Sequence, residues 1–371
     1  MDNRFRLKKI TISGYKSISA ECPLSIELGD INILLGANGS GKSNIISFFK
    51  MLNYMMTGSF QLFIEKSGTS QVFLHYGSKH TKNIEGMLCF ENDAAVDNYN
   101  FSLVHAIPDK LRIISEEVSW RRKGEETPQT IFLDSDFKES ALISSRDKTS
   151  MIIHKILNTC KVYQFHDSSS ESPIRQASPF WSGNYLQAQG NNLASFLLFL
   201  KGKYRSHYDR IVSYIHFIMP QFKDFYLEPN NGGYVMLNWT DTSLNDYVLL
   251  PEQLSDGTIR FIALATLLLQ PKETVPKVII IDEPELGLHP FAIDSLAEMI
   301  KDAAKRTQVI VATQSPGLAD HFDTDQIIVI ERDEKQECSV ANRLNEDDLS
   351  EWLKHYSISE LWEKNVIGGR P

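Results

Sequence analysis

Short alternating stretches of apolar and polar residues dominate the first half of the chain, and longer apolar runs dominate the last third. Alternation predicts half-buried strands at residues 5–12 and 24–28, whereas the unbroken apolar run at 31–35 predicts a strand buried on both faces. Residues 71–165 are rich in β-branched and aromatic residues, which Gly, Asn, Asp and Pro interrupt. The antiparallel strands predicted there lie at residues 73–74, 86–90, 99–105 and 130–133.

Helical spacing predicts most of the remaining elements. Residues 43–56 contain no Gly or Pro and come soon after the buried strand, so we expect a helix there. A loop is expected at 166–184, followed by two helices within 192–219 that break near Gly202, and then by strands within 225–250. From residue 254 onward helices and strands alternate, which is typical of a parallel α/β fold. The elements expected there are a helix after 257, a strand at 278–281, a helix at 290–305, a strand at 309–312, a short helix and a strand at 326–330.

A glycine-rich segment stands between the buried strand and the first helix. Its sequence is Gly36-Ala37-Asn38-Gly39-Ser40-Gly41-Lys42-Ser43, and Asn44 follows. Glycines let successive backbone N–H groups converge on phosphate oxygens, and a helix start adds its positive dipole end. Lys42 is placed to reach the β- and γ-phosphates, and the Ser43 hydroxyl is placed to ligate Mg²⁺. Residues 36–44 are therefore a predicted nucleotide and Mg²⁺ site.

Two carboxylates follow the apolar run at residues 278–281. Asp282 and Glu283 stand at the carboxyl end of that predicted strand, where open α/β sheets place ligand groups. We expect Asp282 to hold Mg²⁺ through water, and Glu283 to orient and polarise an attacking water from the other side of the strand. The alternative is structural, because Asp282-Glu283-Pro284 could also cap a helix.

Gln314 follows the predicted strand at 309–312 and is placed to sense a γ-phosphate. Ser315 and Pro316 are expected to begin the next helix, which is compatible with that role.

The turn at 254–257 precedes a helix that is apolar on nearly every face, so we expect this helix to be buried. Ser255, the backbone N–H of Gly257 and the dipole of this helix can form a second anion site. The alternative is that Ser255 or Asp256 simply caps the helix.

Composition excludes several classes of protein. The 371 residues are 42% hydrophobic and 23% charged, as in ordinary globular proteins. The net charge of −9 provides no global basic field, and the cluster at 121–123 is expected to be a solvated turn rather than a nucleic-acid footprint. The four cysteines contain no C-x-x-C pair, which disfavours a zinc site or disulfide framework. Asp134 and Asp136 are expected in a solvated turn. No signal segment or membrane-length apolar run is found, so we expect a soluble, cytoplasmic protein.

These elements, in this order, resemble the ABC-type ATPase heads of the SMC and RecF class, and within it the small bacterial proteins named "AAA family ATPase". The segments that carry the resemblance are Ile10 to Ile18, Asp282 to Pro290, and Trp362 to Pro371. The resemblance implies an α/β P-loop NTPase fold with a mixed central sheet, an N-terminal antiparallel β-subdomain and a helical lobe. It implies one head over residues 1–371. The expected parts are 1–60 (strands and P-loop), 61–185 (mainly β insertion), 186–253 (helical lobe and hairpin), 254–335 (signature to switch) and 336–371 (C-terminal segment).

The resemblance also implies an assembly. The segment from Leu254 to Arg260 corresponds to the ABC signature, which binds the γ-phosphate of ATP on a second subunit. Two heads would then sandwich two ATP molecules, with Ser255 and Gly257 acting on the partner's nucleotide, as a homodimer or within a higher oligomer.

Three departures from related proteins are informative. Gln314 stands where transporter ATPases carry a switch histidine, which favours the SMC and RecF side. The Q-loop glutamine is assigned to Gln164, with Gln71 as its rival. The separation of Ser43 from Leu254 leaves no room for a long coiled coil.

The residues after 330 are too few for the nuclease domain that related OLD-type proteins carry, and residues 346–348 are expected to begin a helix instead.

The leading hypothesis is an ATP-hydrolysing, dimerising switch that controls a separately encoded effector in bacterial defence against phage. One alternative is a RecF-like repair ATPase that binds DNA. Another is a module that binds ATP without hydrolysing it, against which the intact Glu283 argues. A transporter subunit is disfavoured by Gln314 and by the lack of a membrane segment.

Overall fold

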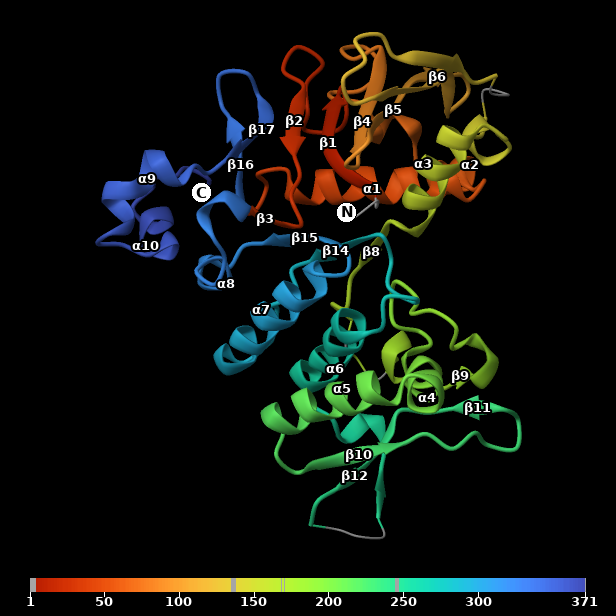
Figure 1. Ribbon diagram of the computed structural model, residues 1–371, viewed down its shortest axis with the longest axis vertical. Coiled ribbons are helices and arrows are strands. Elements are labelled where there is room, and N and C mark those ends of the chain that lie inside the picture. The colour runs from red at the N-terminus through yellow and green to blue at the C-terminus, as the bar shows by residue number, and fades with distance from the viewer. Residues whose placement is uncertain (1–4, 135–137, 168, 170, 244–246, 371) are drawn as a thin grey trace. The chain divides into compact units, whose positions relative to one another are not determined.

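The computed structural model describes residues 5–134, 138–167, 169, 171–243 and 247–370 (Figure 1). The chain forms two compact units. The first unit, here called unit 1, comprises Met1–Lys161 and Asp323–Pro371, and unit 2 comprises Val162–Phe322.

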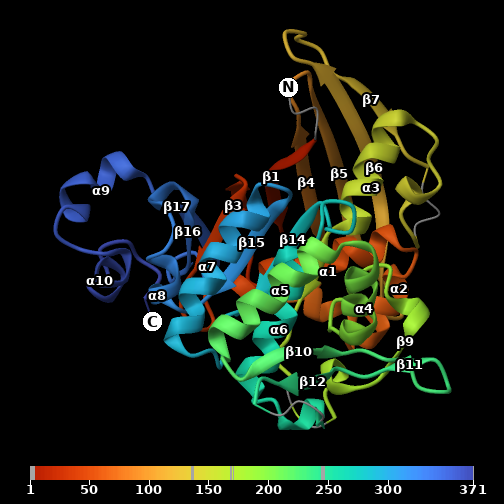
Figure 2. The same cartoon turned by 60° about the horizontal axis from the view of Figure 1, so that its bottom comes forward.

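Unit 1 contains a six-stranded antiparallel sheet in the order β2-β1-β4-β5-β6-β7. Its strands are β1 (Arg6–Ser13), β2 (Leu24–Glu27), β4 (Asn83–Glu91), β5 (Ala95–Ala106), β6 (Lys110–Arg122) and β7 (Gln129–Phe132). Three helices accompany this sheet, namely α1 (Lys42–Met56), α2 (Phe60–Lys66) and α3 (Lys148–Thr159) (Figure 2). Phe48 of α1 stacks on Phe101 of β5 with ring centroids 6.1 Å apart, so the apolar face of α1 is buried against the sheet.

Unit 1 also brings the two ends of the chain together. β3 (Ile31–Leu35) pairs in parallel with β16 (Ile327–Asp333), and β17 (Cys338–Arg343) pairs antiparallel with β16, which gives a mixed sheet. All five residues of β3 are buried, as its unbroken apolar sequence predicts. The chain then forms α9 (Glu346–Leu353) and α10 (Ile358–Glu363).

Unit 2 is built on β14 (Val278–Asp282), which pairs in parallel with β15 (Gln308–Thr313) and is flanked by β8 (Lys161–Tyr163). Its helices are α4 (Leu193–Lys203), α5 (Arg205–Ile218), α6 (Asp256–Leu269), α7 (Pro290–Ala304) and α8 (Pro316–Ala319). Ten residues of α6 are buried, which agrees with its apolar faces. The short strands are β9 (Ser178–Pro179), β10 (Phe222–Tyr226), β11 (Tyr234–Val235), β12 (Asn238–Asp241) and β13 (Val248–Leu249).

The predicted fold class, an α/β protein with a mixed sheet, an antiparallel β-subdomain and a helical lobe, is confirmed. The strand expected at 73–74 is wrong, because residues Ser70–Phe73 form a 3₁₀ helix whose first turn is capped by the Thr69 side chain. The elements that were not expected from the sequence include α2, α3, α10, β6, β8, β9 and β17. Of these, β9 lies within the segment that was expected to be a loop. Part of the basic cluster at 121–123 belongs to β6 rather than to a turn. Asp136 lies outside the described residues, so the pair Asp134 and Asp136 has no structural account. In the described part of the chain, no helix combines the length and the apolar character needed to cross a bilayer.

Candidate functional site

The phosphate loop of unit 1 has the backbone that its glycines allow. Gly39 has a φ of 82° and Gly41 has a φ of 112°. Residues other than glycine rarely adopt such positive φ values. Gly41 is the N-cap of α1, so Lys42 and Ser43 form the first turn of that helix. Ser43 is exposed, whereas Lys42 is buried. Ala37, Asn38 and Ser40 complete the loop, and a Cβ added to Gly39 would meet no atom within 4 Å.

Side chains remote in sequence hold this loop in place. The Ser339 hydroxyl on β17 donates to the carbonyl of Ser40 at 2.7 Å, and a Cβ on Gly41 would collide with it. Asn44 donates to the hydroxyl of Ser17 at 2.7 Å. Two further backbone contacts come from the C-terminal part of the chain: Ala37 N–H donates to the carbonyl of Gly369 at 2.9 Å, and Gly36 packs on the carbonyl of Ile330. None of these supports was predicted.

Lys42 bonds to its own loop. Its Nζ donates to the carbonyls of Gly36 at 2.6 Å and Ala37 at 2.8 Å. A buried ammonium needs such acceptors, and a phosphate group supplies stronger ones. The Lys42 ammonium group is thus held beside the phosphate loop. The backbone N–H groups of this loop can point toward a bound anion.

At the carboxyl end of β14, unit 2 brings together Asp282, which was assigned to Mg²⁺, and Gln164, which was assigned to the Q-loop. Gln164 Nε2 donates to Asp282 Oδ2 at 2.8 Å, and His166 Nε2 lies 2.9 Å from the carbonyl oxygen of Asp282. The rival glutamine, Gln71, belongs to unit 1, where its amide contacts His105 and the backbone of residue 78. Of the two Q-loop candidates, Gln164 is therefore the one that contacts Asp282 within its own unit. His166 was not predicted.

Glu283 has an unusual backbone. Its φ is 46°, a left-handed value that costs a non-glycine residue energy, and its N–H donates to the carbonyl of Ala312 at 2.8 Å. The Gln314 amide donates to Glu283 Oε1. The helix-capping interpretation of residues 282–284 is wrong, because α7 begins at Pro290 and is capped by His289. Capping by Ser315 is confirmed, since its hydroxyl accepts from the backbone N–H of residue 318.

A third carboxylate supports this arrangement. Glu285 Oε1 accepts hydrogen bonds from the Thr313 hydroxyl at 2.5 Å and from the Gln314 N–H at 3.3 Å. Burial raises the pKa of the Glu285 carboxyl, the hydrogen bonds from Thr313 and Gln314 oppose this rise, and the nearby Glu283 charge adds to it. Glu285 fixes the backbone of Gln314, and Gln314 in turn contacts Glu283. This role of Glu285 was not predicted.

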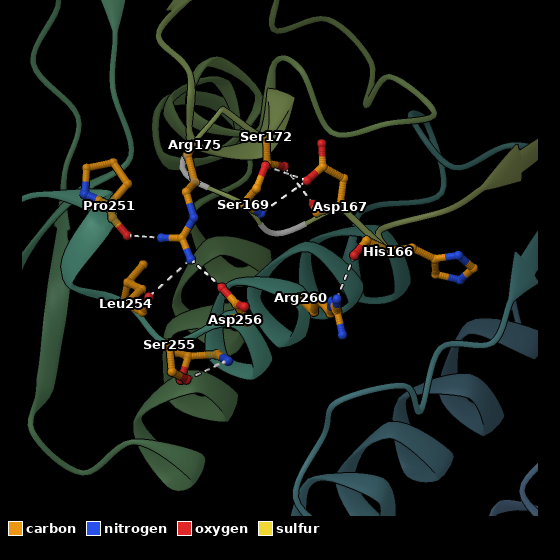
Figure 3. A network of polar contacts seen from close by, with 11 residues as sticks. His166, Asp167, Ser169, Ser172, Arg175, Pro251, Leu254, Ser255, Asp256 and Arg260 are labelled. Atoms are coloured by element: carbon orange, nitrogen blue, oxygen red, sulfur yellow. Dashed lines mark hydrogen bonds and ion pairs between the residues drawn. The ribbon is translucent and has the colours of Figure 1, made fainter.

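The turn before α6 has the predicted cap. The Ser255 hydroxyl accepts from the Thr258 N–H at 3.2 Å, so the capping role of Ser255 is confirmed. Gly257 lies so close to Gly287 that an added Cβ would be 2.6 Å from the Gly287 carbonyl oxygen. Arg260, one turn further along α6, donates to the carbonyls of His166 at 2.5 Å and Leu286 at 2.8 Å. The turn is thereby tied to the segment after Gln164, as Figure 3 shows, and to the loop after Glu283.

The residues present fit a nucleotide and a divalent cation. The Ser40 hydroxyl is buried, and the described residues provide it with no hydrogen-bond partner, so an acceptor or donor group of a ligand would satisfy it. Ser43 in unit 1 and Asp282 in unit 2 each carry a hard oxygen atom of the kind that Mg²⁺ prefers. Within the described ranges, no group of three or more His, Cys, Asp or Glu residues forms a metal site. In P-loop enzymes Mg²⁺ is bound by one or two such side chains together with phosphate oxygens.

The family described as "AAA domain, putative AbiEii toxin, Type IV TA system" matches residues 31–320. This range contains the phosphate loop, Gln164, the turn before α6, and both carboxylates of β14. The chain belongs to this family. It is an ATPase of the P-loop class, as the resemblance to ABC-type heads implies.

Solved structures agree on the fold. An SMC head bound to the C-winged helix domain of ScpA matches with a TM-score of 0.60 and 16% identity, covering 92% of this chain and 99% of that one. An SMC head with an extended coiled coil, bound to the C-terminal domain of ScpA derived from Pyrococcus furiosus, matches with a TM-score of 0.58 and 15% identity, covering 95% and 99%. The search of curated proteins gave no match. The SMC-like head fold of this family member is thus confirmed.

Proposed function

We propose that this ATPase is a dimerising switch that controls a separately encoded effector in bacterial defence against phage. ATP binds the loop at residues 36–44, where Lys42 contacts the β- and γ-phosphates. Ser43 and Asp282 hold Mg²⁺, and Glu283 orients the water that attacks the γ-phosphate. Ser255 and the Gly257 N–H contact the nucleotide of a second subunit, so two heads close on two ATP molecules.

One observation carries the catalytic part of this proposal. Each carboxylate at the end of β14 is contacted by a glutamine, Asp282 by Gln164 and Glu283 by Gln314. A glutamine amide has both a hydrogen-bond donor and an acceptor. Its hydrogen bond to a carboxylate can therefore be replaced by one to a water molecule or a phosphate oxygen. Two such amides beside two carboxylates suit a site that must recognise the γ-phosphate and then hydrolyse it.

The partner rests on a different observation. The description of the family names a toxin–antitoxin system, which has two components, and this supports a separately encoded effector. The SMC heads that this chain resembles were each solved with a domain of another protein, ScpA. Both facts support regulation through a bound protein, whose identity we leave to experiment.

Hydrolysis is tested by steady-state turnover of Mg-ATP. Glu283→Gln should lower kcat at least about 100-fold and leave ATP binding intact, because the base is lost and the phosphate contacts are kept. Glu298→Gln, a change on the exposed face of α7, is the matched control. Wild-type protein that hydrolyses no ATP, alone or with the product of the neighbouring gene, would contradict the proposal.

Dimerisation is tested by analytical ultracentrifugation of the Glu283→Gln protein with Mg-ATP. The dimer should form with ATP, disappear in ADP, and be blocked by Ser255→Arg, which places a bulky side chain where the partner's nucleotide would lie. Ser213→Arg on the exposed side of α5 is the control. A monomer in ATP would refute the head-to-tail assembly. ATP-dependent retardation of DNA would instead favour the RecF-like alternative.

A further inference from the structure

The first turn of α6 carries a negative charge where a phosphate is expected. Asp256 is the first residue of the helix, directly after the Ser255 cap, and its side chain is 66% exposed. A carboxylate at a helix N-terminus stabilises the helix. It also repels any second anion that approaches the same N–H groups, so an acidic residue here opposes the proposed role of Ser255 and Gly257.

A buried arginine contacts this carboxylate. The Arg175 side chain is 4% exposed, and its NH2 group donates to Asp256 Oδ1 at 3.0 Å. The same guanidinium donates to the carbonyl oxygens of Pro251 and, at 3.2 Å, of Leu254. Figure 3 shows the Asp256 carboxylate directed toward Arg175, while the Ser255 hydroxyl lies on the side away from it.

The geometry of Arg175 suits both fixation and neutralisation. A guanidinium is a rigid fork that remains charged at any physiological pH, and it can reach several acceptors at once. Its acceptors include two backbone carbonyls of the loop that leads into Ser255 and the carboxylate that would repel a phosphate. Burial of an arginine is unfavourable without such acceptors. The position of the Arg175 guanidinium therefore depends on these oxygen atoms.

We propose that Arg175 is a positioning residue for the turn before α6. It fixes the loop from Pro251 to Leu254 and neutralises Asp256, so that Ser255 and Gly257 can bind a nucleotide phosphate. This inference rests on the proposed function of Ser255 and Gly257. Arg175 itself does not contact the phosphate. It acts through the loop and through the charge of Asp256, and these two effects can be separated by mutation.

The charge effect is tested in the Glu283→Gln protein by the Kd of the ATP-dependent dimer. Arg175→Ala should raise this Kd at least about tenfold, because Asp256 then faces the partner's phosphate with its full charge. Adding Asp256→Asn should recover at least about threefold of that loss, whereas Asp256→Asn alone should change the Kd less than about twofold. A double variant no better than Arg175→Ala, or an Arg175→Ala dimer as tight as its parent, would overturn the inference.

The matched control is Arg205→Ala. Arg205 forms an ion pair with Asp209 at 2.8 Å in the same unit, close to the 3.0 Å of the Arg175 pair, but both of its side chains are more than half exposed. This variant should leave the dimer Kd unchanged. If Arg175→Ala does not fold, Arg175→Gln provides a neutral side chain that keeps two N–H donors, and the same rescue by Asp256→Asn is expected.

The fixation effect is measured without ATP, by amide hydrogen exchange of peptides covering residues 250–258. Arg175→Ala should accelerate exchange there at least about tenfold over Arg205→Ala, because the loop loses its anchor. Unchanged exchange would overturn the inference. If the Glu283→Gln protein itself fails to dimerise with ATP, the proposed function is refuted, and hydrogen exchange still decides whether Arg175 fixes this loop.

Discussion

Replacement of Glu285 by alanine tests whether the proposed catalytic carboxylate, Glu283, depends on a neighbour that does not touch the substrate. Glu285 Oε1 accepts from the Thr313 hydroxyl and from the Gln314 N–H, and the Gln314 amide donates to Glu283. The Thr313 oxygen also accepts from the backbone N–H of Ser315 at 2.9 Å. Glu285→Ala removes the acceptor at the centre of this turn, so the end of β15 loses its orientation.

The magnitude follows from the two hydrogen bonds. A hydrogen bond to a charged group contributes about 1.5–3 kcal/mol, and the longer bond at 3.3 Å contributes at the low end. The two bonds together contribute about 3–4.5 kcal/mol. If about half of that energy orients Gln314, the barrier to hydrolysis rises by about 1.5–2.3 kcal/mol, which is roughly a 10- to 50-fold loss in kcat. The KM for ATP should change less than about threefold, because the phosphate loop is untouched. Glu285→Gln should keep most of the activity, since its amide oxygen still accepts both hydrogen bonds.

Steady-state ATPase assays on four proteins decide the matter: wild type, Glu285→Ala, Gln314→Ala and the double variant. If Glu285 acts through Gln314, the double variant should be no slower than Gln314→Ala alone. Glu298→Ala, an exposed change on α7, is the control. A folded Glu285→Ala protein with kcat within about twofold of wild type would refute the reasoning, and so would fully additive losses in the double variant.

Three further predictions concern unit 1. Lys42→Ala should weaken ATP binding at least about 100-fold in calorimetric titration, because the phosphates lose their cation; binding close to wild type would contradict the assignment. Gly41→Ala should lower the free energy of unfolding in urea by about 1–3 kcal/mol, since φ is 112° and the new Cβ meets Ser339, and an unchanged midpoint would count against this close approach. Burial, with a smaller contribution from the Asp147 charge, raises the pKa of Asp97 to about 6. The folded state therefore binds this proton more tightly, and the stability it provides is complete below about pH 4 and lost as the pH rises through about 6. Asp97→Asn should then stabilise the protein by about 1–2 kcal/mol at pH 8, after allowance for solvent screening, and by nothing below about pH 4; a pH-independent effect in urea denaturation would refute it.

The phosphate loop and the end of β14 could be predicted because their signals are local. A strand of five apolar residues, a glycine-rich turn and a helix without Gly or Pro follow one another within residues 31–56. The pair Asp282 and Glu283 likewise follows its own strand directly. In such segments the backbone conformation and the chemistry are determined by neighbouring residues, so no long-range contact needs to be known.

The supporting residues could not be predicted, since their roles arise from contacts between distant segments. Ser339 reaches the phosphate loop because β17 pairs with β16, and Arg175 reaches Asp256 across a separation in sequence that no local pattern bridges. Glu285 differs, because it lies beside Glu283 in sequence. Its function depends on Thr313, however, and β15 had to be paired with β14 before that contact could be seen.

The strand β6 and the helix α3 were missed for different reasons. In β6 the register shifts beside Ile114, so the alternation of buried and exposed residues changes phase there. Glu116, a buried carboxylate, follows this shift and accepts from Tyr99, which makes the segment look polar. For α3 a usable signal existed: Asp147 caps the helix by accepting from the Ser150 N–H.

Three side chains assigned to the nucleotide site already have protein partners. Lys42 donates to two carbonyls of its own loop, Gln164 donates to Asp282, and Gln314 donates to Glu283. ATP, Mg²⁺ and water would exchange for these contacts, and each exchanged hydrogen bond contributes only about 0.5–1.5 kcal/mol net. Several such exchanges together reach the roughly 1–3 kcal/mol that couples one site to another. In the proposed switch, no single contact is then strong enough to hold one state, and loss of the γ-phosphate after hydrolysis would remove enough of them to reverse it.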